Sequence, residues 1–586
     1  MRKRTLLINI IVLTGMLLLF IWLQNSQFGV ISVGNLEMPS VNVDSQSGKE
    51  EIHPWYNESD DCFYYFLPAF AKESEYYAEQ MSEFDVKFLK SENIPAVFIT
   101  TESGSMEYLV ADKENEEPGE IRIINAGGEH EYSGALEKIT GRGNTSWEKY
   151  NKKPYTISLK ESAPLLQMGN GKRWYLLPVW REGNRINTKV VFDIAEALGL
   201  EYTPQCTWID LYFNGEYAGN YLLCEAVSVG KGRVDVFDLE KENQTINGNL
   251  QESDTFDEGG RKGYEIQNGP DVTGGYLIEK DLAAYFAEEK CGFITESGKQ
   301  FTIGAPKHAS RQQVSYIADY VQMIENLILS HNTEYTNYID LDSFAARFLV
   351  DEISLNCDAN ITSMFFYKDR NDDLLYAGPV WDYDSAMGDL NSGWMAGGAV
   401  NYRNTTLSDF RNSEDTLGWY ASMYEDEIFY EEICRIYEQA LPEIAIILET
   451  QIDQYADLIR ASAQMDMIRW QNEDKRDDYP GHYQSFDNNV RYLKYFLANR
   501  LNYLNERWEI AYTQFEAPGN GETHQVTFRN GEDIVEVRQV QDGEVIIDPP
   551  YLDGEVYWGW YYEHSVEKLR DQIPVYEDVV LFAREK

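Results

Sequence analysis

The sequence of 586 residues predicts an α+β fold in which a β-rich half precedes a helical half. Apolar residues recur with period two in segments between residues 94 and 225, and with period 3.6 from residue 312 onward. A linker signal at residues 517–521, Ala-Pro-Gly-Asn-Gly, separates a last short β-rich segment. Because a chain of this length exceeds what one hydrophobic core usually serves, we expect two or three folded units.

The β-rich half contains a hairpin with a well-defined turn and one helix. Asn214-Gly215 between two apolar runs is a strong signal for a two-residue hairpin turn. Residues 190–198 carry their apolar side chains on one helical face and end at Gly199, as a helix does at its C-cap. The predicted strands are residues 96–100, 121–123, 155–159, 207–213 and 217–225.

The helical half begins where the apolar period changes to 3.6. A short strand pair, residues 364–368 and 374–380, interrupts it and leads into Trp381. A Gly-rich loop follows at residues 388–398. Helices are predicted over residues 312–328 and 338–356, and again over residues 419–513.

The N-terminus predicts a membrane anchor. Residues 1–4 are basic apart from Met1, and residues 5–23 carry no charge over about the 20 residues that a membrane-spanning helix needs. No small-residue cleavage site follows, so we interpret the segment as a signal anchor with residues 1–4 in the cytoplasm and the body outside the cell. A cleaved signal peptide is the alternative, and it also exports the body. Residues 24–60 are polar and aperiodic, which predicts a stalk.

The charge and the motifs of the chain exclude several functions. With 98 acidic and 50 basic residues the formal net charge is −48, which disfavours nucleic acid as a partner. The seven histidines show no H-E-x-x-H spacing, and the sequence has no G-x-S-x-G elbow and no P-loop. The six cysteines form no C-x-x-C motif, and only Cys206 and Cys224, on neighbouring predicted strands, suggest a disulfide worth testing.

Two carboxylates follow the strand that ends at Trp381. Asp382 and Asp384 lie two residues apart, before Gly388. Magnesium takes one or two carboxylates and completes its coordination with phosphate and water oxygens, so this pair suits a metal–phosphate site. A bare D-x-D is also common as a pair of solvated turn acids, and that alternative stays open.

Two more segments could share such a site. Asp358 and Asn360 lie upstream, between a predicted helix and a hairpin, as the catalytic Asp of a protein kinase precedes its metal-binding Asp. Capping and turn roles are the alternative for both residues. Arg142, between two glycines, and the pair Lys152-Lys153 form a basic segment that can contact phosphate oxygens.

Four ordered motifs resemble those of the CotH (spore coat protein H) kinase family, over roughly residues 90 to 515. They are the R-G-N-T-S-W segment at residues 142–147, the K-K-P-Y strand at residues 152–155, the N-G-E-Y-A-G-N-Y hairpin at residues 214–221 and the W-D-Y-D segment at residues 381–384. Four motifs in order are more specific than any one alone.

The resemblance implies a divergent, atypical protein-kinase-like domain with two lobes. Such a protein binds ATP with Mg²⁺ or Mn²⁺ and phosphorylates protein substrates, here at the cell surface or the spore coat. Asp358 resembles the acid of the catalytic loop, and Asp382 and Asp384 resemble the metal-binding acids, Asp384 also lying at the catalytic centre. Arg142, Lys153 and Glu225 are expected on the nucleotide side, the last two as an ion pair like the Lys–Glu pair of kinases.

One position departs from the kinase pattern. A kinase catalytic loop places a metal-binding Asn five residues after its Asp, and position 363 is Ser. Asn360 is the expected substitute ligand, with Asn356 as the alternative. A catalytically inactive, kinase-like surface scaffold or adhesion protein is therefore the rival hypothesis.

The last segment, residues 522–586, predicts a small β-rich module. Val526-Thr527-Phe528, Gly543, a proline pair and Gly559-Trp560-Tyr561 resemble the internalin-type β-grasp repeat of bacterial surface proteins. This module suggests a surface location as well.

Overall fold

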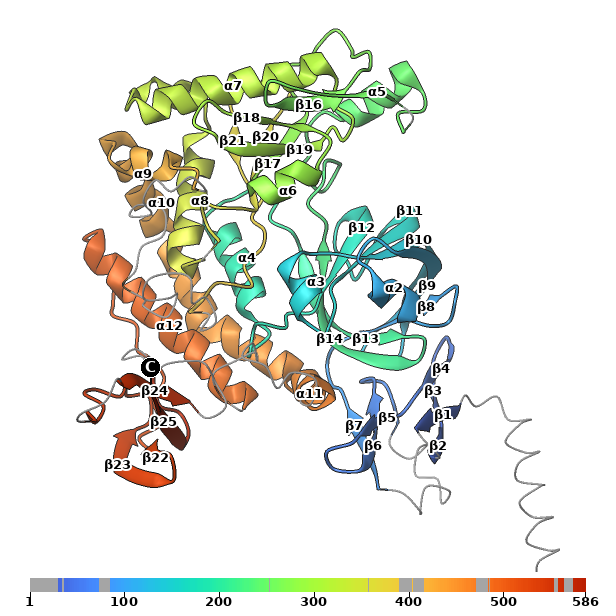
Figure 1. The fold of residues 1–586 in the computed structure, drawn as a ribbon, viewed down its shortest axis with the longest axis vertical. Coiled ribbons are helices and arrows are strands. Elements are labelled where there is room, and N and C mark those ends of the chain that lie inside the picture. Colours follow the sequence, from blue (N-terminus) through green and yellow to red (C-terminus); the bar gives the residue numbers. More distant parts are fainter. Residues whose placement is uncertain are drawn as a thin grey trace, which may run out of the picture.

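The computed structural model describes residues 30–33, 36–72, 85–251, 253–356, 358–388, 403, 416–470, 483, 485–552, 557–562 and 573–585. A β-barrel lies beside a seven-stranded sheet, long helices pack along both, and a small sheet at the C-terminus lies at the end of the helical layer (Figure 1). The predicted α+β fold is confirmed.

Seven strands close into a barrel in the order β10-β11-β12-β14-β13-β8-β9. Alternation along each strand turns apolar side chains such as Trp174, Ile157 and Leu223 into the barrel core. The predicted hairpin turn is confirmed, since Asn214 and Gly215 both have positive φ. The strands are β8 (Ala96–Thr101), β9 (Glu116–Ile124), β10 (His130–Gly141), β11 (Tyr155–Pro164), β12 (Asn170–Leu177), β13 (Cys206–Phe213) and β14 (Glu216–Glu225), with the helices α2 (Glu107–Ala111), α3 (Thr145–Lys149) and α4 (Asn187–Ala197) between them.

The stalk predicted for residues 24–60 is wrong for the part that the structure describes. Short strands form there, and Val43 and Ile52 are fully buried in a core shared with Phe98 and Tyr212 of the barrel. These strands are short and each has few apolar residues. The two-residue hydrophobic period that predicts a strand is therefore hard to detect among their polar residues. The strands in this range are β1 (Val30–Val33), β2 (Leu36–Pro39), β3 (Val41–Ser45), β4 (Gly48–Ile52) and β5 (Trp55–Asn57). Strands β6 (Cys62–Leu67) and β7 (Val86–Lys90) follow and form a sheet of order β5-β6-β7.

The second sheet has the order β15-β16-β18-β19-β17-β20-β21. Helix α7 (Arg311–Leu329) covers one side of it and begins at the capping box of Ser310 and Gln313 (Figure 1). Its strands are β15 (Thr255–Glu258), β16 (Arg261–Tyr264), β17 (Tyr276–Asp281), β18 (Gly292–Ile294), β19 (Gln300–Ala305), β20 (Met364–Lys368) and β21 (Tyr376–Ala377), accompanied by α5 (Leu239–Asn247), α6 (Ala283–Glu288) and the 3₁₀ turn η3 (Thr333–Asn337).

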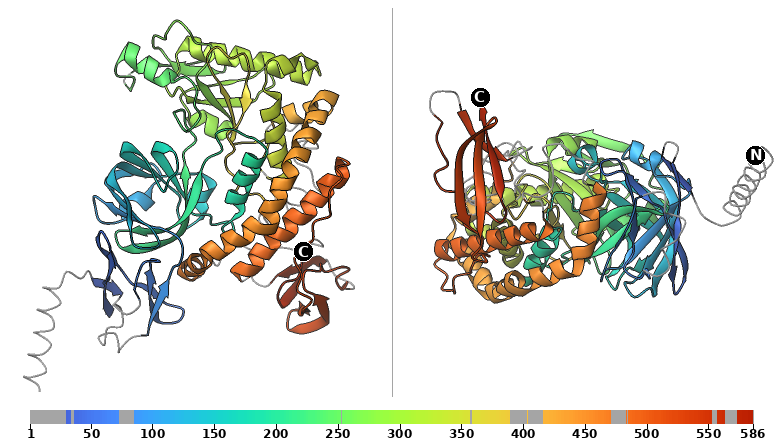
Figure 2. Two further views of the ribbon diagram at one scale, coloured as in Figure 1. Left: turned by 180° about the vertical axis from the view of Figure 1, so that it is seen from behind. Right: turned by 90° about the horizontal axis from the view of Figure 1, so that it is seen from below.

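Long helices form the layer that supports both sheets (Figure 2). Helices α10 (Glu427–Ile446) and α11 (Ile452–Trp470) are continuous through a π-helical segment, η4 (Ile447–Gln451). The other helices of the layer are α8 (Leu341–Ser354), α9 (Trp419–Tyr424) and α12 (Phe486–Arg507). A core of apolar side chains from α4, α7, α8, α10 and α12 unites this layer with the second sheet.

A buried polar network joins α11 to the barrel. Asp466 of α11 lies 2.7 Å from Lys152 and accepts hydrogen bonds from Arg185 and from the backbone N–H of Asn220. Asp466 and Lys152 are both completely buried. We call this group, which also includes Asp210, Asn220 and Ser462, the α11–barrel network.

The C-terminal module is a four-stranded sheet of order β23-β22-β25-β24. It packs on α12 through a tyrosine cluster that includes Tyr483, Tyr492 and Tyr576. Within the predicted β-rich module, residues 543–547 form no strand and make a single bridge, between Val545 and Pro574. The strands are β22 (Thr523–Asn530), β23 (Asp533–Gln541), β24 (Tyr557–Tyr562) and β25 (Val579–Glu585).

Two further sequence predictions concern the membrane and the cysteines. Residues 5–23 lie outside the described residues, and among the helices that the structure describes none combines the length and apolarity needed to cross a bilayer. Cys206 and Cys224 lie directly opposite each other on β13 and β14, as predicted, with both thiols free.

Candidate functional site

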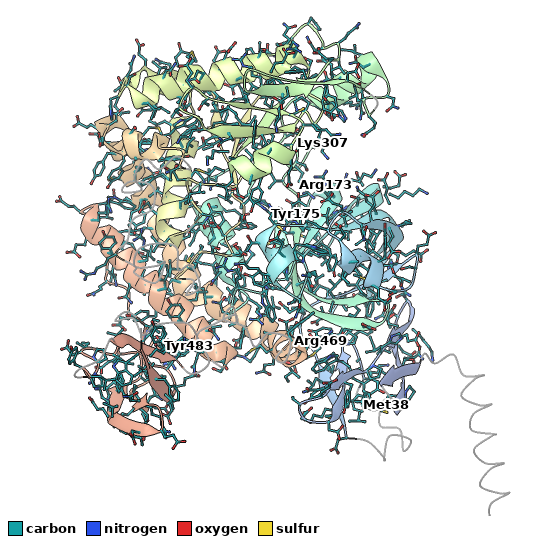
Figure 3. All side chains as sticks on the ribbon, in the orientation of Figure 1. Met38, Arg173, Tyr175, Lys307, Arg469 and Tyr483 are labelled. Atoms are coloured by element: carbon teal, nitrogen blue, oxygen red, sulfur yellow. The ribbon has the colours of Figure 1, made fainter. Side chains whose placement is uncertain are left out.

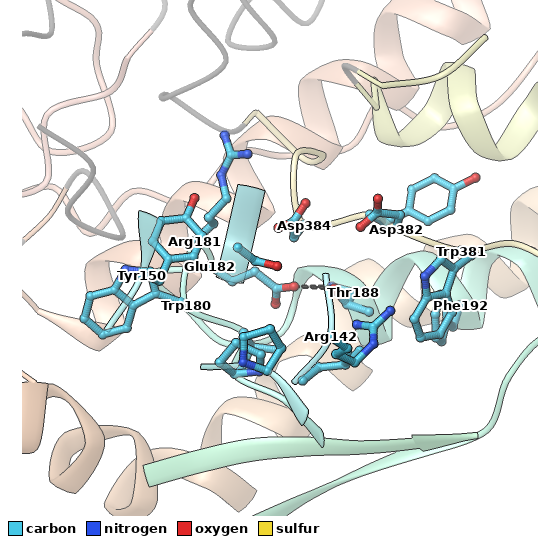
Figure 4. A pocket seen from close by; sticks show the side chains of 16 residues that line it. Arg142, Tyr150, Trp180, Arg181, Glu182, Thr188, Phe192, Trp381, Asp382 and Asp384 are labelled. Carbon is cyan, nitrogen blue, oxygen red and sulfur yellow. Dashed lines mark hydrogen bonds between the residues drawn. The ribbon is translucent and has the colours of Figure 1, made fainter. Parts of the chain in front are cut away.

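A pocket lies where the barrel, the start of α4 and the 381–384 segment meet (Figure 4). It contains about 550 Å³ of space that opens to solvent. Three carboxylates line it, those of Glu182, Asp382 and Asp384, and Arg142 lies among them. Its aromatic walls are Tyr150, Trp180, Phe192, Trp381 and Tyr383.

The W-D-Y-D segment alternates buried aromatic residues with acids that face the pocket. Trp381 and Tyr383 are buried, whereas Asp382 is exposed and Asp384 partly exposed. The hydroxyl of Tyr383 donates a hydrogen bond of 2.7 Å to the buried Asp351 of α8, which anchors the segment to the helical layer. Asp382 has a φ of 68°, a left-handed conformation that is uncommon outside glycine and is often found at functional sites.

The structure brings the Asp358 loop to the same place. Asn356 bridges the two segments, because its side-chain oxygen accepts from the backbone N–H of Asp358 (3.2 Å) and its Nδ2 donates to the carbonyl of Asp382 (3.4 Å). Ser363, at the position of the kinase Asn, donates its hydroxyl to Oδ2 of Asp382 at 3.2 Å. Two acids that are separated by a hairpin in the sequence are therefore neighbours in the fold.

The electrostatics of the pocket centre on Asp382. Its carboxylate is open to the pocket but enclosed by protein, and this loss of hydration raises its pKa to about 7, with the charges of Asp384 and Asp358 adding to the effect. Arg142 and the Ser363 hydroxyl act in the opposite direction. Clustered negative charge of this kind favours the binding of a cation.

Arg142 reaches the pocket from the end of β10. Its guanidinium stacks on two aromatic rings, 4.3 Å from the centre of Tyr175 and 5.2 Å from that of Trp381. Figure 3 shows Tyr175 on the side of the barrel that faces the second sheet. Gly141 must be glycine here, because a Cβ would lie 2.6 Å from the ring of Trp147. Among the described residues no carboxylate forms an ion pair with Arg142, so its charge is available to an anion.

The predicted ion pair of Lys153 with Glu225 is wrong. Glu225, at the end of β14, forms its ion pair with Arg233 and accepts the backbone N–H groups of Gly169 and Gln205. Lys153 donates to the carbonyl oxygen of Trp147. Lys152, in the bend before β11, is the lysine that enters the protein interior, where Asp466 is its partner.

Asn360, the predicted metal ligand, lies away from the pocket lining. It is fully buried, and its Oδ1 accepts the backbone N–H of Gly418 at 3.3 Å. Its own carbonyl accepts the N–H of Leu417. The side chain thus fastens the Asp358 loop to the start of α9, and Ser363 is the residue that contacts Asp382.

The segment that forms the other wall of the pocket was not predicted from the sequence. Trp180, Arg181 and Glu182 lie between β12 and α4, and Thr188 lies in the first turn of α4. Arg181 donates to the hydroxyl of Ser385 at 2.7 Å, beside Asp384. A Trp-Arg-Glu-Gly-Asn-Arg run between two apolar segments in so acidic a chain was the available signal.

The residues of the pocket fit a divalent metal ion that is bound together with phosphate. No three acidic, histidine or cysteine side chains in the described ranges are arranged to hold an ion by themselves. Magnesium needs only one or two carboxylates when phosphate oxygens and water complete its shell, and Asp382 and Asp384 supply that number.

Comparison with known proteins identifies the family. The model of the CotH kinase protein family matches residues 139–504, which is more than half of the chain and includes the Arg142, Asp358 and Asp382 segments. The C-terminal module lies outside this match, and its resemblance to a β-grasp repeat stays a prediction. No curated protein matches the sequence significantly. This chain belongs to the CotH kinase family.

Proposed function

We propose that this chain transfers the γ-phosphoryl group of ATP to a hydroxyl group of a protein at the outer cell surface or in the spore coat. The observation that carries the proposal is that Asp382 and Asp384 line one pocket with the guanidinium of Arg142, while the charge of Asp358 acts on Asp382 from the loop that Asn356 links to it. Membership of a kinase family supports the same reaction.

Each acid has a role in this reaction. Asp382 and Asp384 would hold Mg²⁺ or Mn²⁺, which when bound neutralises charge on the phosphate oxygens. Asp358 orients the acceptor hydroxyl and accepts its proton as the oxygen bonds to the γ-phosphorus. The bond from the γ-phosphorus to the bridging oxygen breaks in the same step, and ADP leaves.

The basic and polar residues hold the reacting groups in place. Arg142, fixed between Tyr175 and Trp381, presents its N–H groups to phosphate oxygens. The hydroxyl of Ser363 orients Asp382. Because Asn356 links the backbones of both acid segments, the distance between Asp358 and Asp382 is set by the fold rather than by the ligand.

The arrangement also supports the two-lobed organisation that the family resemblance implies. In this proposal the barrel is the smaller lobe and contributes Arg142, and the second sheet with its helices is the larger lobe and contributes the three aspartates. An N-terminal signal anchor that leaves the body outside the cell is part of the proposal.

A non-catalytic scaffold or adhesion protein is the second candidate. The observation that favours it is the exposed apolar edge of the C-terminal sheet, where Ile534 of β23 is 56% exposed and Val537 is 48% exposed. An exposed apolar edge strand is typical of a surface that pairs with another chain.

Phosphoryl transfer by the purified full-length chain separates the two candidates. We expect labelling from γ-³²P-ATP with Mn²⁺, on the chain itself or on an added protein, and we expect ATP with Mn²⁺ to raise the melting temperature. The control variant Asp373→Asn should label like the wild type, because Asp373 is an exposed acid in the β20–β21 turn and does not line the pocket. No labelling combined with no ATP-dependent rise in melting temperature contradicts the kinase proposal.

A further inference from the structure

Glu182 is a buried acid in the pocket that uses only one of its two oxygens. The residue is 1% exposed and lies between β12 and α4. Its Oε1 accepts the backbone N–H of Thr188 at 3.2 Å and also the Thr188 hydroxyl. Its Oε2 is buried without a hydrogen-bond partner in the described structure.

Helix capping explains the position of one of the two carboxylate oxygens of Glu182, Oε1. Thr188 is the second residue of α4, so Oε1 satisfies an N–H group that has no partner within the helix. An unpartnered buried carboxylate oxygen costs free energy, and such an orphan in a native structure indicates a missing ion, water or ligand group. The Oε2 atom therefore needs an explanation that capping does not give.

The residues around Glu182 favour a cation as the ligand of its Oε2. Glu182 lines the same pocket as Asp382 and Asp384 and lies next to Asp384 in Figure 4. Burial raises the pKa of Glu182 to about 7, and the charge of Asp384 contributes in the same direction. Three carboxylates around one pocket repel each other, and a cation removes this repulsion, whereas an anion or an apolar group does not.

We propose that Glu182 is the third carboxylate of the phosphoryl-transfer pocket, and that its Oε2 and Asp384 bind a second divalent cation, which enters with the nucleotide. This inference rests on the proposed function. Two metal ions that share phosphate oxygens are a recurring arrangement in phosphoryl transfer. Two carboxylates from the protein suffice for such an ion, since phosphate and water supply its other ligands.

The number of Mn²⁺ ions bound with a non-hydrolysable ATP analogue tests the inference on the full-length chain. Electron paramagnetic resonance titration should give two Mn²⁺ ions per chain for the wild type and one for Glu182→Gln. Glutamine keeps an oxygen that can cap α4, so this variant removes the charge at Oε2 with little change in shape. Glu196→Gln is the matched control, because Glu196 is an exposed acid on the same helix, and it should bind two ions.

Each other outcome has a definite meaning. Two ions in Glu182→Gln, bound as tightly as in the wild type, would overturn the inference. One ion in the wild type also overturns it and leaves the proposed function intact, whereas no nucleotide-dependent Mn²⁺ at all overturns both. If Glu182→Gln does not fold, Glu182→Asp is the variant to measure. We expect it to bind the second ion at least tenfold more weakly, because the shorter side chain holds the carboxylate farther from the ion. Unchanged binding in Glu182→Asp refutes the assignment.

Discussion

Replacing Asp466 by Asn disrupts the α11–barrel network, which connects the helical layer to the barrel. Asp466 is completely buried, and its two oxygens serve two cations: Lys152 at 2.7 Å from Oδ1, and Arg185 at 3.1 and 3.2 Å from Oδ2. The Asn side chain has nearly the same shape, so the substitution removes the negative charge and leaves two buried positive charges. We expect this variant to be strongly destabilised.

The size of the effect follows from the burial of the partners. Breaking a buried ion pair by removing one partner costs about 3–5 kcal/mol, because the remaining charge is left uncompensated. Lys152 retains the carbonyl oxygens of Pro178 and Asn220, and Arg185 retains that of Glu182, which limits the loss. We therefore expect the free energy of unfolding to fall by about 3–5 kcal/mol, with two cations affected but each partly satisfied by carbonyl groups.

Urea denaturation followed by tryptophan fluorescence measures this change. The matched control is Asp457→Asn on the same helix, because the side chain of Asp457 is 77% exposed and its ion pair with Arg460 lies at the surface. Surface pairs contribute about 0–1 kcal/mol, so the control should be close to the wild type. A loss below about 1 kcal/mol in Asp466→Asn would show that the buried network does not hold the two parts together.

Three more substitutions have expected outcomes. Burial raises the pKa of Asp210 from 3.8 to about 6, so its contribution to stability is fully present below about pH 4 and is lost as the pH rises through 6. The variant Asp210→Asn lacks this titrating group. In urea titrations, the free energy of unfolding of the wild type relative to the variant should therefore fall by about 3 kcal/mol between pH 4 and 6. Gly219→Ala should destabilise by about 2–3 kcal/mol, since φ is +123° and a Cβ would lie 2.2 Å from Asp466 Oδ1. Tyr383→Phe should cost about 1–3 kcal/mol in thermal unfolding, because it leaves an oxygen of the buried Asp351 without its donor.

Each of these outcomes has a control. Gly199→Ala, at a φ of +82° with no atom near the added Cβ, should cost only about 1 kcal/mol. Equal losses in both glycine variants would show that the close approach to Asp466 is unimportant. A stability difference that does not vary between pH 4 and 6 would contradict the burial of Asp210, and an unchanged melting temperature in Tyr383→Phe would contradict the anchoring of the W-D-Y-D segment.

Periodicity and turn chemistry predicted the long helices and part of the strands, whereas β1–β7, β10, β12 and β15–β19 were not predicted. The hairpin at Asn214-Gly215, the helices α4 and α7 and the strand β20 lie where the sequence indicated, because each carries its own local signal. Closure of the barrel could not be predicted, since it depends on the pairing of β8 with β13, which are more than a hundred residues apart.

The site was predicted in part. Motif order identified Asp358, Asp382, Asp384 and Arg142; the structure places the last three in the lining of one pocket and Asp358 close enough to Asp382 to act on its charge. The partners of Lys152 and Lys153 could not be predicted from their positions in the sequence. Which of these two adjacent lysines points into the protein depends on the strands that surround them. Glu182 was missed for a similar reason: a lone acid in a loop gives no signal until the fold buries it beside other acids.

Phosphoryl transfer and nucleotide binding, measured in parallel for the wild type and Asp358→Asn, test the central claim most directly. If Asp358 accepts the proton of the acceptor hydroxyl, the variant should bind ATP with Mn²⁺ at close to wild-type affinity, while its rate of γ-phosphoryl transfer falls by about 10²–10⁴-fold. Equal transfer rates in both proteins, or binding of ATP by the wild type with no transfer to any protein hydroxyl, would contradict the account.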